Sequence, residues 1–249
     1  MTYESKPSMN RVVRKGIKDV WWNAYMVRGA KFSPSDIPYC PTTAKSPPSM
    51  IITYEEAKAI HRRESRKKNY GYLHMAYVSF YQDDYTEDNT QGIWFQSERA
   101  YMVLEYLSGI ITPDFSTYQD FPAPLKLWNT YRMRAFGYWY GTLCGHNVIN
   151  NVRWGTAETY SYCFDGIPKN SMVAVATTGG SPRKLSNRAR FEAGLAEMVT
   201  RLSPHTIIVY GSANFPCFSD LVKKGISIVT YPSRASLAFN KEYNKEQIS

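Results

Sequence analysis

The sequence has few of the residues that build metal centres and disulfide frameworks. Its four cysteines and four histidines are scattered over 249 residues, and no Cys-x-x-Cys pair occurs. This spacing argues against a zinc ribbon and against a disulfide framework, since both need grouped ligands or paired cysteines. We expect the cysteines to be reduced thiols, mainly buried.

Long apolar runs are also missing. No stretch approaches the about 20 apolar residues that span a bilayer, and residues 1–10 lack the apolar centre of a signal peptide. The spacings Gly-x-x-x-x-Gly-Lys-Ser/Thr and Gly-x-Gly-x-x-Gly do not occur either. We therefore expect a cytoplasmic protein without a membrane partner, and find no support for a Walker or dinucleotide site.

The composition is otherwise that of a globular protein rich in aromatic residues. Apolar residues make up 43% and charged residues 20% of the chain, which is ordinary for a folded domain. Aromatic residues reach 15%. They serve either to fill a core or to provide flat surfaces on which ligands and bases stack.

Positive charge is concentrated near the start of the chain. Residues 1–70 carry 14 Lys or Arg residues against six Asp or Glu, so they hold almost all of the net charge of +9. The densest run lies at 61–68, and its candidate nucleic-acid-binding residues are Arg62, Arg63, Arg66, Lys67 and Lys68. Such a run suits a polyphosphate partner. The alternative is a solvated helix end, where cations are also favoured.

We divide the chain into three parts. We expect residues 1–70 to form a basic, proline-containing arm or extension that packs on the body. We expect residues 71–235 to form an α/β domain and residues 236–249 to form a C-terminal tail. The arm is not simply disordered, because the apolar cluster at 20–27 is expected to dock on the body or on a partner.

The body alternates between strand and helix patterns. Strands are predicted at about 74–81, 109–112, 146–154, 172–177, 206–210 and 226–231. Helices are predicted at about 96–107, 122–143, 156–164, 187–202 and 218–224. About six mostly parallel strands alternating with helices follow from this order. A doubly wound sheet and an incomplete barrel both fit the pattern.

The carboxyl ends of parallel strands are where ligands bind in both architectures. Asp114, Arg153 and Asp165 are the candidate catalytic residues, with the carboxylates as acid, base or nucleophile and Arg153 holding a phosphate. No cofactor is indicated, although Mg²⁺ could be held through Asp84 and Asp114. The alternative role for these aspartates is helix capping and turn formation.

A glycine-rich loop follows the strand at 172–177. Glycines let backbone amides approach an anion, and neighbouring cations can close over it. The candidate phosphate- or nucleotide-binding residues are Gly179, Gly180, Ser181, Arg183 and Lys184, together with Ser212 from the next strand exit. A plain tight connection explains the same glycines.

The predicted helix at 122–143 has Trp128, Arg132, Ala135 and Trp139 on one face. A buried arginine on this face needs a carboxylate, for which Asp114 and Asp120 are the nearby candidates. A core-facing aromatic stripe explains this face better than a base-stacking platform.

Several motifs together resemble a known family. They are Ile111 to Ser116, Trp128 to Arg132, Asn151 to Gly155, Phe164 to Asn170 and Val209 to Gly211. Over about residues 70–235 the chain resembles the family known as domain of unknown function 4417. The resemblance implies a setting in phages and mobile elements of Gram-positive bacteria, and it implies no catalytic residue.

Three functional hypotheses follow. The leading one is a mobile-element protein that binds nucleic acid through its basic arm and processes a base, sugar or phosphate at the strand ends. The second is a non-catalytic protein that captures a nucleotide or inhibits a host factor. The third is an oligomer-forming structural component with Trp21 and Trp22 at its interface. The sequence does not decide whether the protein is an enzyme, nor its oligomeric state.

Overall fold

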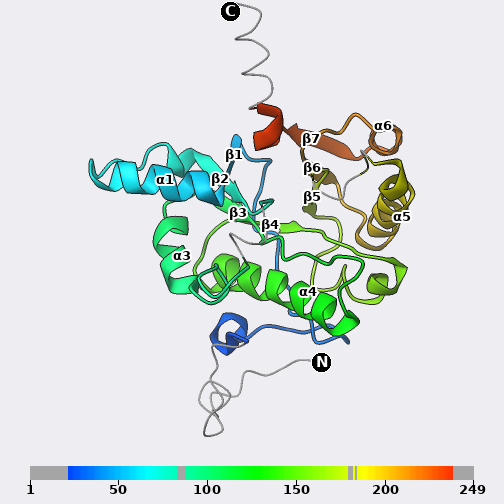
Figure 1. Cartoon of the computed structure of the whole chain (residues 1–249), viewed down its shortest axis with the longest axis horizontal. Helices are drawn as coiled ribbons and strands as arrows, with labels where there is room; N and C mark the ends of the chain where they lie inside the picture. Colours follow the sequence, from blue (N-terminus) through cyan, green and yellow to red (C-terminus); the bar gives the residue numbers. More distant parts are fainter. Residues whose placement is uncertain (1–21, 83–87, 179–181, 183, 238–249) are drawn as a thin grey trace, which may run out of the picture.

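Seven parallel strands form one curved sheet, and the segments between successive strands contain helices (Figure 1). The computed structural model describes residues 22–82, 88–178, 182 and 184–237. The strands are β1 (Met50–Thr53), β2 (Ala76–Ser79), β3 (Gly109–Ile111), β4 (Val148–Asn151), β5 (Met172–Ala176), β6 (Thr206–Tyr210) and β7 (Ser227–Tyr231). The α-helices are α1 (Tyr54–Ser65), α3 (Ser97–Leu104), α4 (Ala123–Tyr138), α5 (Leu185–Leu202) and α6 (Pro216–Lys223).

Shorter helical turns complete the described chain. Three are 3-10 turns, η3 (Ala24–Val27), η4 (Leu73–Met75) and η6 (Ala157–Ser161). α4 continues into one π-helical turn, η5 (Trp139–Leu143). In the described residues, none of the helices is both long enough and apolar enough to cross a bilayer.

The strand order identifies the sheet as a half-barrel. The order in the sheet is β1 to β7, the same as in the chain, and every neighbouring pair is parallel. A doubly wound sheet would reverse its order at a switch point. Tyr81, just after β2, stacks on Tyr210 of β6 with ring centroids 5.1 Å apart. Four strand spacings in a flat sheet would separate them by about 19 Å, so the sheet must curl.

The predicted α/β class is therefore confirmed, and the incomplete barrel is the correct alternative. One strand escaped the prediction, because β1 has only four residues and follows two prolines. Residues 50–65, assigned to the arm from the sequence, form β1 and α1 at one end of the sheet. Thr53 and Glu56 make a capping box at the start of α1, in which each side chain accepts a hydrogen bond from the other's backbone N–H.

Apolar side chains lie on both faces of the sheet. The inner, concave face brings together residues from every strand, including Tyr77, Ile111, Ile149, Ala174 and Ile208. The outer face carries two clusters, one under α1, α3 and α4 and the other under α5 and α6. Strand residues alternate between the two faces, as the pleat requires. The concave face is thus filled at its centre, which leaves the ends of the strands for binding.

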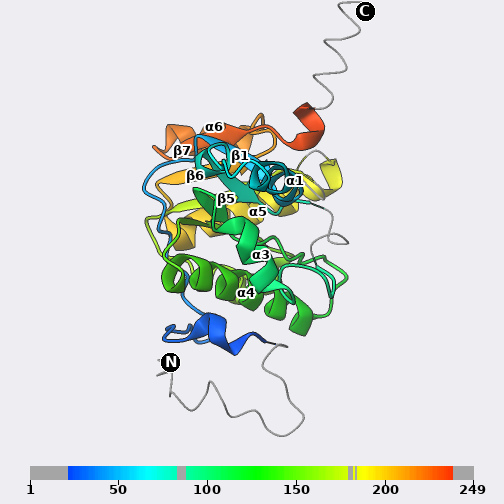
Figure 2. The ribbon, with the colours of Figure 1, turned by 90° about the vertical axis from the view of Figure 1, so that its left-hand side faces the viewer.

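The described part of the N-terminal arm packs on the body, beneath α4 (Figure 2). Met26 is fully buried, and the Asn23 side chain donates a 2.7 Å hydrogen bond to the carbonyl of Trp94. Further along, the Asn150 side chain of β4 donates to the Cys40 carbonyl at 2.8 Å. Within the described residues, the segment 22–27 thus packs on the body. Trp21 lies outside the described residues.

The partner of Arg132 differs from both predicted carboxylates. Arg132 is buried on α4 and forms two hydrogen bonds with the carboxylate of Asp88, at 2.5 and 2.7 Å. Its guanidinium also lies 3.9 Å from the ring centre of Phe115. Asp114 is engaged elsewhere, so the expectation of an Asp114 or Asp120 partner was wrong. Residue 88 precedes α4 by more than thirty positions, and only the fold brings the pair together.

Because two thiols are buried, we expect the fold to lose stability at alkaline pH. Burial raises the pKa of Cys40 and that of Cys163 to about 12, from an ordinary value of 9.0. The folded state therefore keeps protons that the unfolded state loses above about pH 9. This stabilisation is complete below the unfolded pKa and disappears as the pH rises through the folded one.

We expect the free energy of unfolding to fall between about pH 9 and pH 12, by up to about 1.4 kcal/mol per pH unit for each thiol. Urea denaturation at several pH values measures this. Cys163→Ala should show a shallower decline than the wild type. A flat profile in the wild type would contradict the assignment.

Candidate functional site

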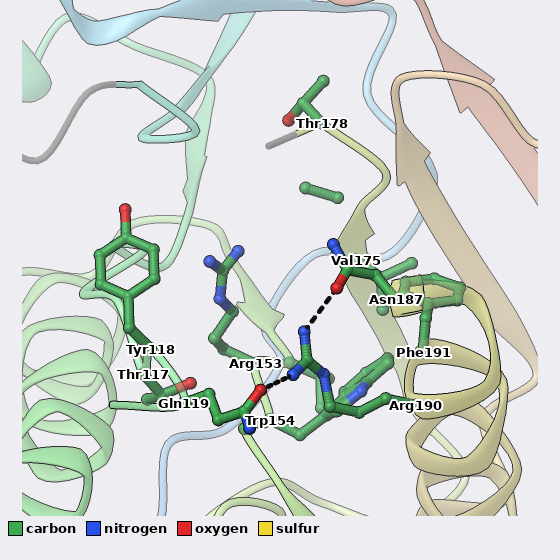
Figure 3. Close-up of a pocket in the computed structure, with 13 residues that line it drawn as sticks. Thr117, Tyr118, Gln119, Arg153, Trp154, Val175, Thr178, Asn187, Arg190 and Phe191 are labelled. Carbon is green, nitrogen blue, oxygen red and sulfur yellow. Dashed lines mark hydrogen bonds between the residues drawn. The ribbon is translucent and has the colours of Figure 1, made fainter. Parts of the chain in front are cut away.

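The carboxyl ends of β3, β4 and β5 surround a small cavity, which we call the arginine pocket (Figure 3). Its volume is about 110 Å³. The β3–α4 loop is fixed by α4, because Asn129 donates to the Ser116 carbonyl and Lys126 to that of Gln119. The lining residues are Thr117, Tyr118, Gln119, Val152, Arg153, Trp154, Gly155, Val175, Ala176, Thr178, Asn187, Arg190 and Phe191.

Among the residues that the structure describes, two guanidinium groups and no carboxylate line this pocket. Arg190 of α5 is held by the side-chain oxygens of Asn187, at 3.1 Å, and Gln119. Arg153 extends from the end of β4 between Tyr118 and Thr178 (Figure 3). Arg190 makes no ion pair with any described carboxylate. Arg190 therefore brings a positive charge to the pocket that no described carboxylate balances, whereas Arg153 is paired with Asp114.

Arg153 is positioned by a chain of side chains that crosses the strand ends. Its guanidinium donates to Oδ2 of Asp114 at 3.2 Å, and the Asn151 amide donates to Oδ1 of the same carboxylate at 2.8 Å. The Tyr81 hydroxyl in turn donates to Oδ1 of Asn151 at 2.9 Å. Both oxygens of Asp114 are thus occupied, which suits a residue that positions Arg153.

Tyr81 is the neutral end of this chain. Burial raises the pKa of Tyr81 well above its ordinary value of 10.0, and the negative charge of Asp114 adds to the rise while Arg153 opposes it. The phenol therefore keeps its proton at neutral pH. It can act as a hydrogen-bond donor and not as a base.

A second hollow lies at the mouth of the half-barrel, and we call it the mouth cavity. Its volume is about 460 Å³, and its walls are mainly apolar. Residues from the ends of β1, β2, β5, β6 and β7 line it: Thr53, Tyr81, Gln82, Thr178, Tyr210, Ser233, Arg234 and Ala235. Thr178 belongs to both hollows. The two cavities therefore share a wall.

The structure brings some predicted residues together and separates others. Asp114 and Arg153 form an ion pair at the arginine pocket. Asp165 instead lines a different hollow, with Ser33 and Lys169, and its carbonyl accepts a hydrogen bond from Arg134. The two aspartates proposed for catalysis do not share a pocket in the described chain.

The predicted phosphate loop lies largely outside the described residues, which do not include Gly179, Gly180, Ser181 or Arg183. Lys184 is exposed at the N-cap of α5. The Ser212 hydroxyl accepts a local hydrogen bond from the Asn214 amide at 3.2 Å. The anion-binding role of this loop stays a prediction.

The same holds for the suggested magnesium site. Asp84 lies outside the described residues, and Asp114 is occupied by Asn151 and Arg153. Among the residues that the structure describes, no three His, Cys, Asp or Glu side chains are grouped to hold a metal.

The basic cluster occupies the far end of α1. The five cations, Arg62, Arg63, Arg66, Lys67 and Lys68, are all exposed. α1 starts at the carboxyl end of β1 and runs about 18 Å over its 12 residues. His61, one turn before the end of α1, packs against Tyr70 and Tyr106, which precede β2 and β3. The cluster therefore lies at the opposite end of the strands from the arginine pocket.

Three residues of the site escaped the sequence analysis: Tyr81, Asn151 and Arg190. Asn151 and Arg190 carried a signal in the sequence, and Tyr81 did not. Asn151 and Arg153 are two residues apart at a strand end and so lie on one face. Asn187, Arg190 and Phe191 share one face at the start of a helix that follows a glycine-rich loop.

The fold and this site define a parallel α/β half-barrel protein with a basic pocket at the strand ends. The chain belongs to the family described as Domain of unknown function (DUF4417), whose profile matches residues 31–232. The predicted resemblance is confirmed, and the family region extends further toward the N-terminus than expected, to include β1 and α1.

The relatives are phage proteins. The chain is 32% identical to the Gene 1 protein of Mycobacterium phage D29 over 66% of this chain and 58% of that protein. It is 35% identical to the Gene 1 protein of Mycobacterium phage L5 over 60% of this chain and 61% of that protein. The matches thus span about three fifths of each relative. No solved structure matches the chain.

Proposed function

We propose that this phage-family protein binds a phosphate-bearing ligand, a nucleotide or a nucleic-acid strand, in the arginine pocket. The observation that carries the proposal is that Arg153 and Arg190 line one cavity whose described wall has no acidic residue, with Asp114 contacting Arg153 from outside that wall. Guanidinium groups suit phosphate because their planar fork donates two parallel hydrogen bonds.

Capture of the ligand and processing of its base, sugar or phosphate are two uses of one site. The position of Asp114 favours capture, because a general base must reach the ligand and Asp114 is not among the residues that line the pocket. Incubation with nucleotides and short oligonucleotides, followed by mass spectrometry, separates the two. Unaltered ligand supports capture, and an altered product supports processing.

We expect Arg153→Gln with Arg190→Gln to weaken pyrophosphate binding by about 100-fold or more, because each charged hydrogen bond contributes about 1.5–3 kcal/mol. Isothermal titration calorimetry measures the loss. Arg188→Gln is the matched control, since Arg188 lies on the same helix but packs over Phe215. Equal affinity in the double variant and the control would refute the pocket.

A second nucleic-acid surface is proposed at the far end of α1. Among its five exposed cations, only Arg63 has a carboxylate partner in the described chain, Glu64 at 3.6 Å. This leaves most of the charge for phosphates. Because the surface and the arginine pocket lie at opposite ends of the strands, we propose that they bind independently.

Replacement of all five cations by Gln should weaken DNA and RNA binding and make it less dependent on salt, by about 0.9 in the log–log slope for each lost phosphate contact. Fluorescence anisotropy at several salt concentrations measures both. Lys223→Gln with Lys224→Gln, two exposed cations near the end of α6, serves as control. An unchanged slope in the five-residue variant would exclude this surface.

A further inference from the structure

The mouth cavity has the size and position of a ligand site next to the arginine pocket. Its volume of about 460 Å³ falls within the range of small-molecule sites, about 300–1,000 Å³. The arginine pocket, at about 110 Å³, accommodates only a small group. Thr178 lines both, so the two cavities are adjacent.

The walls of the mouth cavity favour a flat ring. Tyr81 and Tyr210 both line it, and their rings are stacked with an interplanar angle of 27°. Gln82, Ser233 and Thr53 add polar groups to the wall, and Arg234 adds a cation. Mainly apolar, aromatic walls with few polar groups suit a base better than a sugar, whose hydroxyls would need many partners.

The two cavities are also joined by hydrogen bonds. Tyr81, in the wall of the mouth cavity, is connected through Asn151 and Asp114 to Arg153 in the arginine pocket. A ring that packs against Tyr81 therefore contacts one end of the hydrogen-bonded chain that orients Arg153.

We infer that the mouth cavity binds the nucleoside part of a ligand whose phosphate lies in the arginine pocket, which makes the substrate class nucleotides or the terminal nucleotide of a strand. This inference rests on the proposed function and goes beyond it, because phosphate binding alone requires no ring. An internal nucleotide of a duplex does not fit, since its base is stacked and paired.

Ala235→Trp provides the test, because Ala235 is an exposed residue in the wall of the mouth cavity and is absent from the wall of the arginine pocket. A tryptophan there would fill the mouth cavity from outside without changing the core. Leu237→Trp is the matched control, as Leu237 is 47% exposed nearby and does not line the cavity.

The probes are inorganic phosphate, nucleosides, nucleoside 5′-monophosphates and 5′-phosphorylated single strands, titrated by calorimetry into the full chain. In the wild type and Leu237→Trp, we expect monophosphates to bind at least about tenfold more tightly than phosphate. In Ala235→Trp this advantage should disappear while phosphate affinity is kept. Tight binding of the 5′-phosphorylated strands, lost in the same variant, would identify a strand end as the source of the nucleotide. Tight binding of monophosphates alone would identify the free nucleotide.

Two outcomes would overturn the inference: monophosphates that bind no better than phosphate, or an advantage that survives in Ala235→Trp. Failure of the proposed function looks different, because phosphate itself would then not bind or would ignore the loss of Arg153 and Arg190. The two failures are therefore distinguishable in one set of titrations.

Discussion

Arg134→Met is expected to lower the free energy of unfolding by about 3–5 kcal/mol, the largest effect of any substitution considered. Arg134 is fully buried on α4 and donates to three backbone carbonyls, those of Asn151 at 2.9 Å, Asp165 at 3.2 Å and Cys163 at 3.3 Å. Burial lowers the pKa of Arg134 to about 10, so the group stays charged at neutral pH. Methionine would leave three buried acceptors without a donor.

Urea denaturation and thermal unfolding measure this loss, which corresponds to a fall in Tm of about 10 °C or more. Arg134→Lys keeps the charge but loses the planar, forked set of donors. Its free energy of unfolding should therefore lie between those of the wild type and Arg134→Met. Arg63→Met is the control, because Arg63 is exposed at the end of α1. A loss of less than about 1 kcal/mol in Arg134→Met would contradict this account.

Gly194→Ala is expected to destabilise the protein although alanine is the better helix former. A Cβ at this position of α5 would lie 2.1 Å from Nε1 and 2.3 Å from Cδ1 of Trp154. The indole is packed against Phe191, with centroids 5.4 Å apart, and cannot move aside freely. Overpacking of this kind costs about 1–3 kcal/mol and exceeds the gain of about 1 kcal/mol in helix propensity.

The effect should reach the arginine pocket, because Trp154 lines it. Denaturation measures stability, and pyrophosphate titration measures the pocket. Ala193→Gly is the matched control: it lies at an exposed position of the same helix, and we expect it to lose about 1 kcal/mol and to bind normally. If Gly194→Ala were more stable than the wild type, the Trp154 side chain would have moved to make room for the Cβ, and the prediction would be wrong.

The sequence patterns predicted most of the scaffold. Six of seven strands and every long helix of the body have a local signature, such as the apolar run at 206–210 or the proline that begins α4. β1 was missed because four residues carry too little pattern to be distinguished from the proline-containing segment before them. Residues 50–65, assigned to the arm, therefore contain β1 and α1.

The site was predictable only in part. Asp114 and Arg153 follow from their positions at strand ends, and the structure pairs them. Arg190 lies 37 residues beyond Arg153, and its place in the same pocket depends on how α5 packs on the sheet. Tyr81 and Tyr210 meet because the sheet curls, and no spacing along the chain reports that curvature.

The sequence by itself determined the α/β class, the parallel order implied by alternation, and the edge of the sheet where polar residues gather, because these depend on local periodicity and on the handedness of crossovers. The tertiary structure alone decided that the sheet forms a half-barrel, that Arg132 pairs with Asp88 and Arg153 with Asp114, and that two cavities share a wall at Thr178. These features depend on contacts between residues far apart in the chain, whose distances are set by packing of the whole molecule.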